Sequence, residues 1–426
     1  MPRSTLALVA LAALALSACG GDPESSGSPA PNASASASPT SGDPLFEPDP
    51  AAAGLGAPAP FVLIKTGSTW LYLVNVETDT AERIDISELG AEGNNTMDGD
   101  LSWDGSSVAF DSAATDIVAG DTNGFPDVFL RHVAAGSVAR VSQTGAGEAN
   151  DGSYEPRISA DGTTLVFTSY ATNLVASIAK VPQVYRYDVV SGQISLVQVG
   201  TAAGTAYSTS PAISAGGRYL AYASSTQGEY GDDNFYGDVF VLDTTTGVVE
   251  QASVASDGTP GDFLSGAPSI SLDGGLVAFH SEASNLVGDD ANTVYDVFVR
   301  DRATGETTLV SRGSSGLPGN GDSRDPLIAR GGAGVVFGSQ ASDLVAGDTN
   351  NAYDVFYADL ATGAVTRLSV GPGGAQADAD SFPDAVYGGR YLVFYTFATN
   401  LGGDGDDGPM RQYILDLETG ALNRFI

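Results

Sequence analysis

A short segment led by an aromatic residue recurs seven times along the chain, and this repeat constrains the fold more than any other feature. Successive copies stand 55 to 58 residues apart. They begin at Tyr72, Phe129, Tyr185, Phe240, Phe298, Phe356 and Tyr413. A period of this length is typical of arrays in which each copy is one small unit that packs against its neighbours. We therefore expect repeated blades rather than several unrelated domains.

Each full copy contains four short predicted strands. The first includes a proline, as in Pro156–Ser159, and an Asp-Gly or Gly-Gly pair follows it. These pairs supply the positive φ that a two-residue hairpin needs. The second strand is apolar on both faces, a long loop leads to the aromatic third strand, and a Thr-Gly or Ser-Gly turn opens the fourth. The pattern predicts an all-β fold, a β-propeller of four-stranded antiparallel blades.

The number of blades follows from the seven aromatic third strands, which predict seven blades over residues 61–426. The first copy has no recognisable first strand, because residues 61–64 already resemble a second strand. Six full blades plus a partial closing blade is therefore the alternative, and the closure of the ring stays open. A parallel β-helix is the competing architecture, but its coils are shorter and lack these hairpin turns.

The succession of Pro, Ile-Ser, Asp-Gly and an apolar-aromatic strand resembles the WD40-like propeller repeats of the TolB family. Residues 156–169 and 268–281 match that pattern along their whole length. The resemblance implies a propeller. It implies no particular activity, because a fold does not carry a function with it. We do not carry over the periplasmic role of TolB with a peptidoglycan-associated lipoprotein.

Residues 1–18 have the features of a lipoprotein signal peptide. Arg3 precedes an apolar run from Leu6 to Leu16, and small residues lead to Cys19. The last four of these residues resemble the bacterial lipobox, in which cleavage occurs before the cysteine and the cysteine is acylated with chains such as palmitate. Cys19 is the only cysteine of the chain. We expect an extracytoplasmic protein of the bacterial cell envelope, attached to the membrane only through lipid at Cys19. An ordinary signal peptide with an incidental cysteine is the alternative.

Residues 19–60 are rich in Gly, Ser, Ala and Pro and predict a flexible tether without a core of its own. The rest of the chain is strongly acidic, with 52 acidic and 18 basic residues in the whole sequence and a net charge of −34. This balance excludes a nucleic-acid partner, because phosphate binding needs clustered Lys and Arg. We expect a monomer with an unidentified protein or glycan partner.

Four loops between second and third strands share the pattern Asp-x-Asn-x-x-x-Asp. Side-chain oxygens at alternating positions of a tight loop can coordinate a hard cation such as Ca²⁺, although the usual closing glutamate is missing. The candidate metal ligands are Asp121, Asn123, Asp127, Asp232, Asn234, Asp238, Asp290, Asn292, Asp296, Asp348, Asn350 and Asp354. The alternative is that these side chains only bind the backbone of their own loops. Ca²⁺ is the one candidate cofactor.

A second phrase precedes these loops, and in it an apolar pair stands among polar residues. Examples are residues 171–175, 283–287 and 341–345. We expect the apolar pair to pack back onto the edge of the blade and so to order the loop.

The sequence identifies no catalytic residue. His132 is expected at a turn and His280 on the outer face of a strand, and carboxylate pairs arise by chance in so acidic a chain. We predict a non-enzymatic binding or scaffold module. The alternative is a glycan hydrolase or lyase that uses carboxylates of the propeller funnel. Convergent carboxylates beside stacking Tyr or Trp rings in that funnel would favour the enzyme.

Overall fold

The structure is a computed structural model. It describes residue 55 and the ranges 57–66, 70–87, 96–176, 180–197, 206–225, 234, 236–329, 332–402 and 410–425. The chain separates into two units, Met1–Ala37 and Ser38–Ile426, and every described residue belongs to the second unit. Among the described residues, no helix has the length and apolar character needed to cross a membrane.

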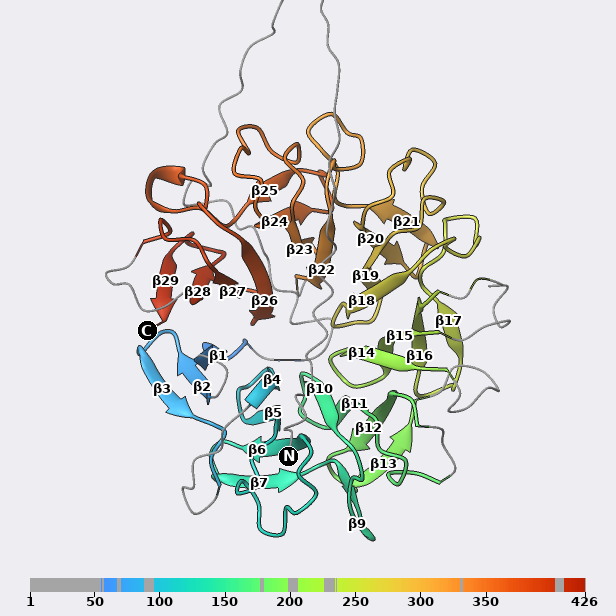
Figure 1. Ribbon diagram of the computed structural model, residues 1–426, viewed down its shortest axis with the longest axis vertical. Coiled ribbons are helices and arrows are strands. Elements are labelled where there is room, and N and C mark those ends of the chain that lie inside the picture. Colours follow the sequence, from blue (N-terminus) through green and yellow to red (C-terminus); the bar gives the residue numbers. More distant parts are fainter. Residues whose placement is uncertain are drawn as a thin grey trace, which may run out of the picture. The chain divides into compact units, whose positions relative to one another are not determined.

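Seven antiparallel sheets are arranged around a central axis, so the chain is a seven-bladed β-propeller (Figure 1). Blade 1 has the strands β1 (Phe61–Thr66), β2 (Trp70–Asn75) and β3 (Thr80–Arg83). Blade 2 has β4 (Thr96–Leu101), β5 (Ser107–Ser112), β6 (Asp127–His132) and β7 (Ser137–Arg140). Blade 3 has β10 (Ser153–Ile158), β11 (Thr164–Ser169), β12 (Gln183–Asp188) and β13 (Gln193–Leu196). Blade 4 has β14 (Ser208–Ile213), β15 (Tyr219–Ser224), β16 (Asp238–Asp243) and β17 (Val249–Gln251).

The remaining blades repeat the same four-stranded order. Blade 5 has β18 (Ser265–Ile270), β19 (Leu276–Ser281), β20 (Asp296–Asp301) and β21 (Glu306–Leu309). Blade 6 has β22 (Ser323–Ile328), β23 (Gly334–Ser339), β24 (Asp354–Asp359) and β25 (Val365–Arg367). Blade 7 has β26 (Ser381–Tyr387), β27 (Tyr391–Thr396), β28 (Arg411–Asp416) and β29 (Leu422–Phe425). A small hairpin, β8 (Gln143–Thr144) with β9 (Gly147–Glu148), and the short helix η1 (Pro372–Gly374) lie in connections between blades.

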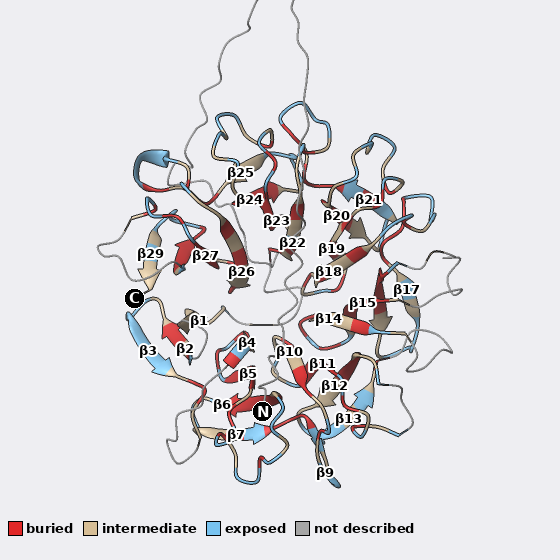
Figure 2. Ribbon diagram, viewed as in Figure 1, coloured by how far each residue is buried: buried red, intermediate tan, exposed pale blue. Residues whose placement is uncertain are grey.

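The buried core is built from the second and third strands (Figure 2). In each blade from 2 to 7, an aromatic ring on the second strand packs against an aromatic ring on the third. The pair Phe110 and Phe129 is typical, with stacked rings whose centroids are 5.4 Å apart. Apolar clusters join each blade to the next. Both faces of these strands are therefore buried, as their apolar sequence predicts.

The two faces of the ring differ because consecutive strands run in opposite directions. The long loops between second and third strands and the starts of the first strands lie on one face, which we call the loop face. The tight hairpins and the Thr-Gly turns lie on the opposite face, which we call the turn face. Positive φ values at Gly105, Gly162 and Gly274 confirm that the Asp-Gly pairs form the predicted hairpins.

Blade 1 and blade 7 close the ring by side-chain packing rather than by a shared sheet. β1 pairs with β2, so residues 61–64 do form a second-type strand, as expected, and the three-strand blade contains no first strand among its described residues. The Lys65 amide donates to Gln412 of blade 7 at 2.9 Å. Val62 and Leu71 share one apolar cluster with Tyr391 and Ile414. The described residues thus form seven blades, of which the first has three strands.

The apolar pairs of the second repeated phrase pack inward, which confirms that expectation. Their buried leucines are Leu174, Leu286, Leu344 and Leu401. Next to them, polar side chains join consecutive blades. At the junction of blades 4 and 5, Asp262 accepts the Ser284 amide at 2.9 Å, and Asn285 accepts the Asp262 amide at 3.0 Å. These contacts hold the loop face in a fixed arrangement.

Candidate functional site at the mouth of the central channel

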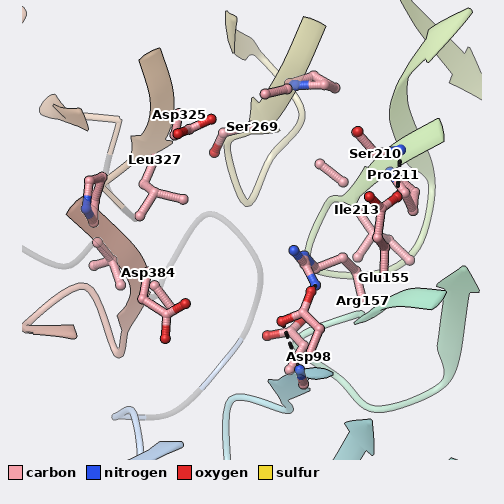
Figure 3. A pocket seen from close by; sticks show the side chains of 18 of the residues that line it. Asp98, Glu155, Arg157, Ser210, Pro211, Ile213, Ser269, Asp325, Leu327 and Asp384 are labelled. Atoms are coloured by element: carbon pink, nitrogen blue, oxygen red, sulfur yellow. Dashed lines mark hydrogen bonds and ion pairs between the residues drawn. The ribbon is translucent and has the colours of Figure 1, made fainter. Parts of the chain in front are cut away.

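The innermost strands surround a central cavity of about 420 Å³. Every blade contributes to its lining, with β1 in the place of a first strand in blade 1. Apolar and proline side chains make up much of this wall. Its charged residues are Lys65, Asp98, Asp100, Glu155, Arg157, Asp325 and Asp384. Figure 3 shows that Asp98 and Arg157 point toward one another, while Asp325 and Asp384 come from the neighbouring strands β22 and β26. The cavity lining, like the whole chain, therefore contains more acidic than basic residues.

A bulge interrupts the first strand in each blade from 2 to 7. In blades 3 to 6 a residue other than glycine adopts a left-handed conformation at the bulge and stands directly before a proline. These residues are Glu155, Ser210, Ala267 and Asp325, with φ values of 55°, 53°, 44° and 53°. Such a conformation is uncommon, and a following proline disfavours helical backbone angles. Retaining it in four blades indicates that the surrounding contacts fix the backbone at the channel wall.

Side chains of neighbouring strands bind the amides at three of these bulges. Asp111 accepts the Asp98 amide at 2.7 Å and, with its other oxygen, the Glu155 amide at 3.2 Å. Glu155 accepts the Ser210 amide at 2.9 Å. His280 Nδ1 lies 3.3 Å from the Asp325 amide nitrogen, which donates to it. Burial, followed by the charge of Asp98, raises the pKa of Asp111 to about 7.

His280 does not lie on an outer face, so that expectation was wrong. Its ring faces blade 6 near the channel mouth and makes an edge contact with Tyr295 at 5.0 Å. Gly266 on the paired strand leaves room for the imidazole. Burial and the charge of Arg324 lower the pKa of His280 to about 4, so the ring is neutral near pH 7 and can accept a hydrogen bond. His132, at the end of β6, is exposed on the turn face as expected.

The charges on one side of the channel form a network. Arg157 lies 2.7 Å from Asp98, and Lys65 lies 3.3 Å from Asp384 and 3.9 Å from Asp98. Burial raises the pKa of Asp98, but the charges of Arg157 and Lys65 outweigh burial and hold that pKa below its ordinary value. Asp98 is therefore an ionised structural partner of two blades rather than a proton donor.

On another side of the cavity, the lining carboxylate of Asp325 lies near a group of aromatic rings. The side chain of Asp325 is 59% exposed and lies 3.9 Å from His280. Phe382 packs between Tyr353 and Tyr395, with ring centroids 5.1 and 5.2 Å apart. All three rings are half-buried. None of these three rings lines the cavity, so they do not supply the combination of carboxylates and stacking rings in the funnel that the enzyme hypothesis requires.

The acidic loops hold their predicted residues in hydrogen bonds. The asparagines Asn123, Asn234, Asn292 and Asn350 donate to carbonyl oxygens of the connection leading to the next blade, at 3.1, 2.9, 3.1 and 2.8 Å. The closing aspartates Asp127, Asp238, Asp296 and Asp354 are buried and accept the hydroxyls of Ser142, Ser253, Ser311 and Ser369, at 2.5, 2.7, 2.5 and 2.5 Å. The contact of the backbone-binding alternative is made by the asparagine oxygens, which accept an amide two residues further along their own loops, at 2.8, 2.7, 3.0 and 3.1 Å in the same order.

Arginine side chains neutralise two of these loops. Arg140 lies 3.4 Å from Asp121 and 3.2 Å from Asp127. Arg367 has the same place in blade 6, at 3.4 Å from Asp348 and 3.2 Å from Asp354. Each of these arginines is the last residue of the fourth strand in its blade. The sequence repeat alone does not show that its side chain reaches the loop between the second and third strands.

The loop of blade 5 differs, because its nearest arginine contacts another residue. Arg312 pairs with Asp289 at 2.6 Å, and no ion pair within 4 Å links Asp290 or Asp296 to a described cation. Asp232 and Cys19 lie outside the described residues. The described part of the chain contains no cluster of three or more Asp, Glu, His or Cys side chains arranged to hold a metal. Calcium binding by the loops stays a prediction.

Comparison with known proteins supports the propeller fold and nothing more specific. No family model matches the chain, and no curated protein matches it. The propeller domain of the trilobed protease from Pyrococcus furiosus is similar at a TM-score of 0.52 and 9% identity, over 85% of this chain and 97% of that domain. The chain is a β-propeller. The tricorn protease gives a TM-score of 0.52 at 12% identity, over 87% of this chain and 34% of that protein.

TolB proteins are also among the similar structures. TolB from Acinetobacter baumannii gives a TM-score of 0.42 at 14% identity, over 72% of this chain. The propeller spans 62% of that TolB protein. The seven blades of the structure confirm the propeller expected from the repeats. A propeller by itself does not decide whether this protein is an enzyme, because a fold does not carry a function with it.

Proposed function

We propose that this protein is a non-enzymatic binding module of the bacterial cell envelope, which holds part of a protein or glycan partner in its central channel. One observation carries the proposal: most carboxylates of the mouth already bind groups of the protein itself. Asp98 is paired with Arg157, Asp111 accepts backbone amides of two blades, and Glu155 accepts an amide of a third. These contacts fix the shape of the channel wall.

A glycan hydrolase or lyase needs a group that is free to donate or accept a proton near its working pH. Asp98 is held ionised by two cations, and the neutral His280 is occupied by the Asp325 amide. Asp325 lines the cavity and is 59% exposed, and Asp384, which also lines it, is paired with Lys65 at 3.3 Å. Side chains of this kind can bind hydroxyl or ammonium groups of a ligand without chemical change.

The proposal is tested by retention on immobilised protein. Solubilised envelope proteins and a digest of peptidoglycan are passed over the wild type, over Asp325→Asn/Asp384→Asn and over the control Asp116→Asn/Glu306→Gln. The control removes the same charge from exposed carboxylates outside the channel. We expect a ligand that the wild type and the control retain with unchanged mass and that the channel variant loses. Hydrolysed or unsaturated glycan products released by the wild type would establish the enzyme instead, and equal retention by all three proteins would reject the channel site.

The attachment to the envelope is a separate part of the proposal, because Cys19 lies outside the described residues. It is supported by the lipobox-like residues that lead to Cys19. Cells fed labelled palmitate should label the wild type and not Cys19→Ser, and the labelled protein should sediment with membranes. An unlabelled wild type would contradict the lipid anchor and leave the binding site unaffected.

A further inference from the structure

The exposed aromatic side chains of the described residues all lie on the loop face. They are Trp70, Phe125, Tyr170, Tyr207, Tyr236, Phe263 and Phe397. Each stands at the start of a first or third strand or at the end of a second strand, which places it on that face. Val190 and Val248, which are also exposed, lie in turns of the opposite face. An asymmetric distribution of exposed apolar surface is typical of a protein with an interaction face.

Three of these rings form a continuous patch across blades 4 and 5. Tyr236 and Phe263 stack with their centroids 4.3 Å apart and their planes at 21°. Tyr207 lies beside Tyr236, because its hydroxyl covers Gly237: a Cβ atom there would come within 2.6 Å of that oxygen. The three side chains are 36%, 41% and 42% exposed for Tyr207, Tyr236 and Phe263. None of them lines the channel, so this patch is distinct from the candidate site described above.

The charge around the patch is negative. Asp262 directly precedes Phe263, and Glu282 lies beside Leu264, whose carbonyl accepts the Glu282 amide at 3.0 Å. Two cations elsewhere on the loop face already have acidic partners, since Lys180 pairs with Asp151 and Arg324 with Asp322, each at 2.9 Å. With a net charge of −34 over the whole chain, this face favours a positively charged partner.

We infer that the loop face docks a basic segment of a partner protein, with Tyr207, Tyr236 and Phe263 as the anchor of the contact. Tyr and Phe are enriched in protein interfaces, and a few aromatic anchors often carry much of the binding energy. The Lys and Arg side chains of such a partner can place their charge over these rings, and the carboxylates beside the patch can neutralise that charge. The inference goes beyond the channel site, because the patch lies outside it.

The test selects a random dodecapeptide display library on the wild-type protein at 150 mM salt and measures the affinity of the enriched peptides. We expect peptides with Lys or Arg beside apolar residues. The variant Tyr236→Ser/Phe263→Ser should bind them about tenfold more weakly or worse. The matched control Val190→Ser/Val248→Ser, which removes exposed apolar side chains from the turn face, should bind them like the wild type. Thermal melting of both variants checks that the propeller is intact.

The channel variant Asp325→Asn/Asp384→Asn separates the two proposals. It should bind these peptides like the wild type, whereas loss of binding by this variant alone would place the peptides in the channel and overturn the inference. The absence of enrichment, enrichment of acidic peptides, or equal binding by Tyr236→Ser/Phe263→Ser would also overturn it. So would patch-dependent binding to vesicles of phosphatidylglycerol, because the occupant would then be a membrane.

Discussion

The guanidinium of Arg157 lies 2.7 Å from the carboxylate of Asp98 and so joins the inner strands of blades 2 and 3 across the channel wall. Both side chains are about one-third exposed to the channel, at 38% and 28%. The contact therefore contributes modestly to stability, and it matters more for the shape of the mouth.

The variant Arg157→Met should unfold with a free energy lower by roughly 1 kcal/mol at pH 7. The charges of Arg157 and Lys65 hold the pKa of Asp98 below its ordinary value. Their contribution is present above the unfolded pKa of Asp98, near 4, and is lost as the pH falls through the folded pKa. Urea unfolding at pH 7 and pH 3 measures this: the difference from the wild type should shrink at pH 3. An equal difference at both pH values would reject the ion pair as its cause.

Asp111 should make stability depend on pH in the opposite direction. Its folded pKa is about 7, and its ordinary value is 3.8. The folded state therefore binds more protons than the unfolded state between these values, and the free energy of unfolding falls as the pH rises from about 4 to 7. In Asp111→Asn this slope should flatten, by up to about 1.4 kcal/mol per pH unit. Asp116→Asn is the exposed control, and parallel curves for Asp111→Asn and the wild type would disprove the assignment.

Arg140 neutralises a buried acidic loop, so its removal should be costly. The variant Arg140→Leu leaves the buried carboxylate of Asp127 without its cation, and we expect a loss of about 3–5 kcal/mol. Arg218→Leu, which removes the partner of Asp243 at an exposed pair, is the control and should change stability far less. Urea unfolding of both variants compares them. Similar losses would mean that burial of the Asp127 carboxylate does not make the removal of its cation costly.

The calcium prediction is best tested in the loop of blade 5. Saturating Ca²⁺ should raise the melting temperature relative to a chelator, because a ligand specific for the folded state stabilises it. Asp290→Asn should abolish the shift, whereas Asp121→Asn, in a loop that Arg140 of β7 neutralises, should keep it. A wild-type melting temperature that does not respond to Ca²⁺ would rule out a folded-state calcium site.

Gly274 shows how closely the blades approach at the turn face. Its φ is +77°, and a Cβ atom would lie 2.2 Å from the ring of Tyr219 in the preceding blade. Gly274→Ala should therefore lose about 2 kcal/mol or more through strain and overpacking. Gly247 has a similar φ of +72° but open space around it, so Gly247→Ala should lose about 1 kcal/mol. Thermal unfolding would contradict this account if the two variants were equally stable.

Much of the propeller could be predicted because its signals are local. The Asp-Gly pairs, the doubly apolar second strands and the aromatic third strands each act within a few residues of the chain. The prediction that residues 61–64 form a second-type strand held for the same reason. The predicted position of His280 was wrong, because strand alternation does not show which neighbouring blade a side chain faces. It also does not show that Gly266, on the paired strand, leaves room for the imidazole ring.

The sequence by itself determined the repeated antiparallel unit, its seven copies and the acidity of the chain, because period, turn residues and charge can be read along the backbone. The tertiary structure alone decided which acids are neutralised and which side chains lie exposed beside one another. Arg140 reaches Asp121, Arg157 reaches Asp98, and Tyr236 meets Phe263 only after the loops and blades are packed together. Such contacts depend on distances between residues that lie 19 to 59 positions apart, and a periodic sequence pattern carries no information about those distances.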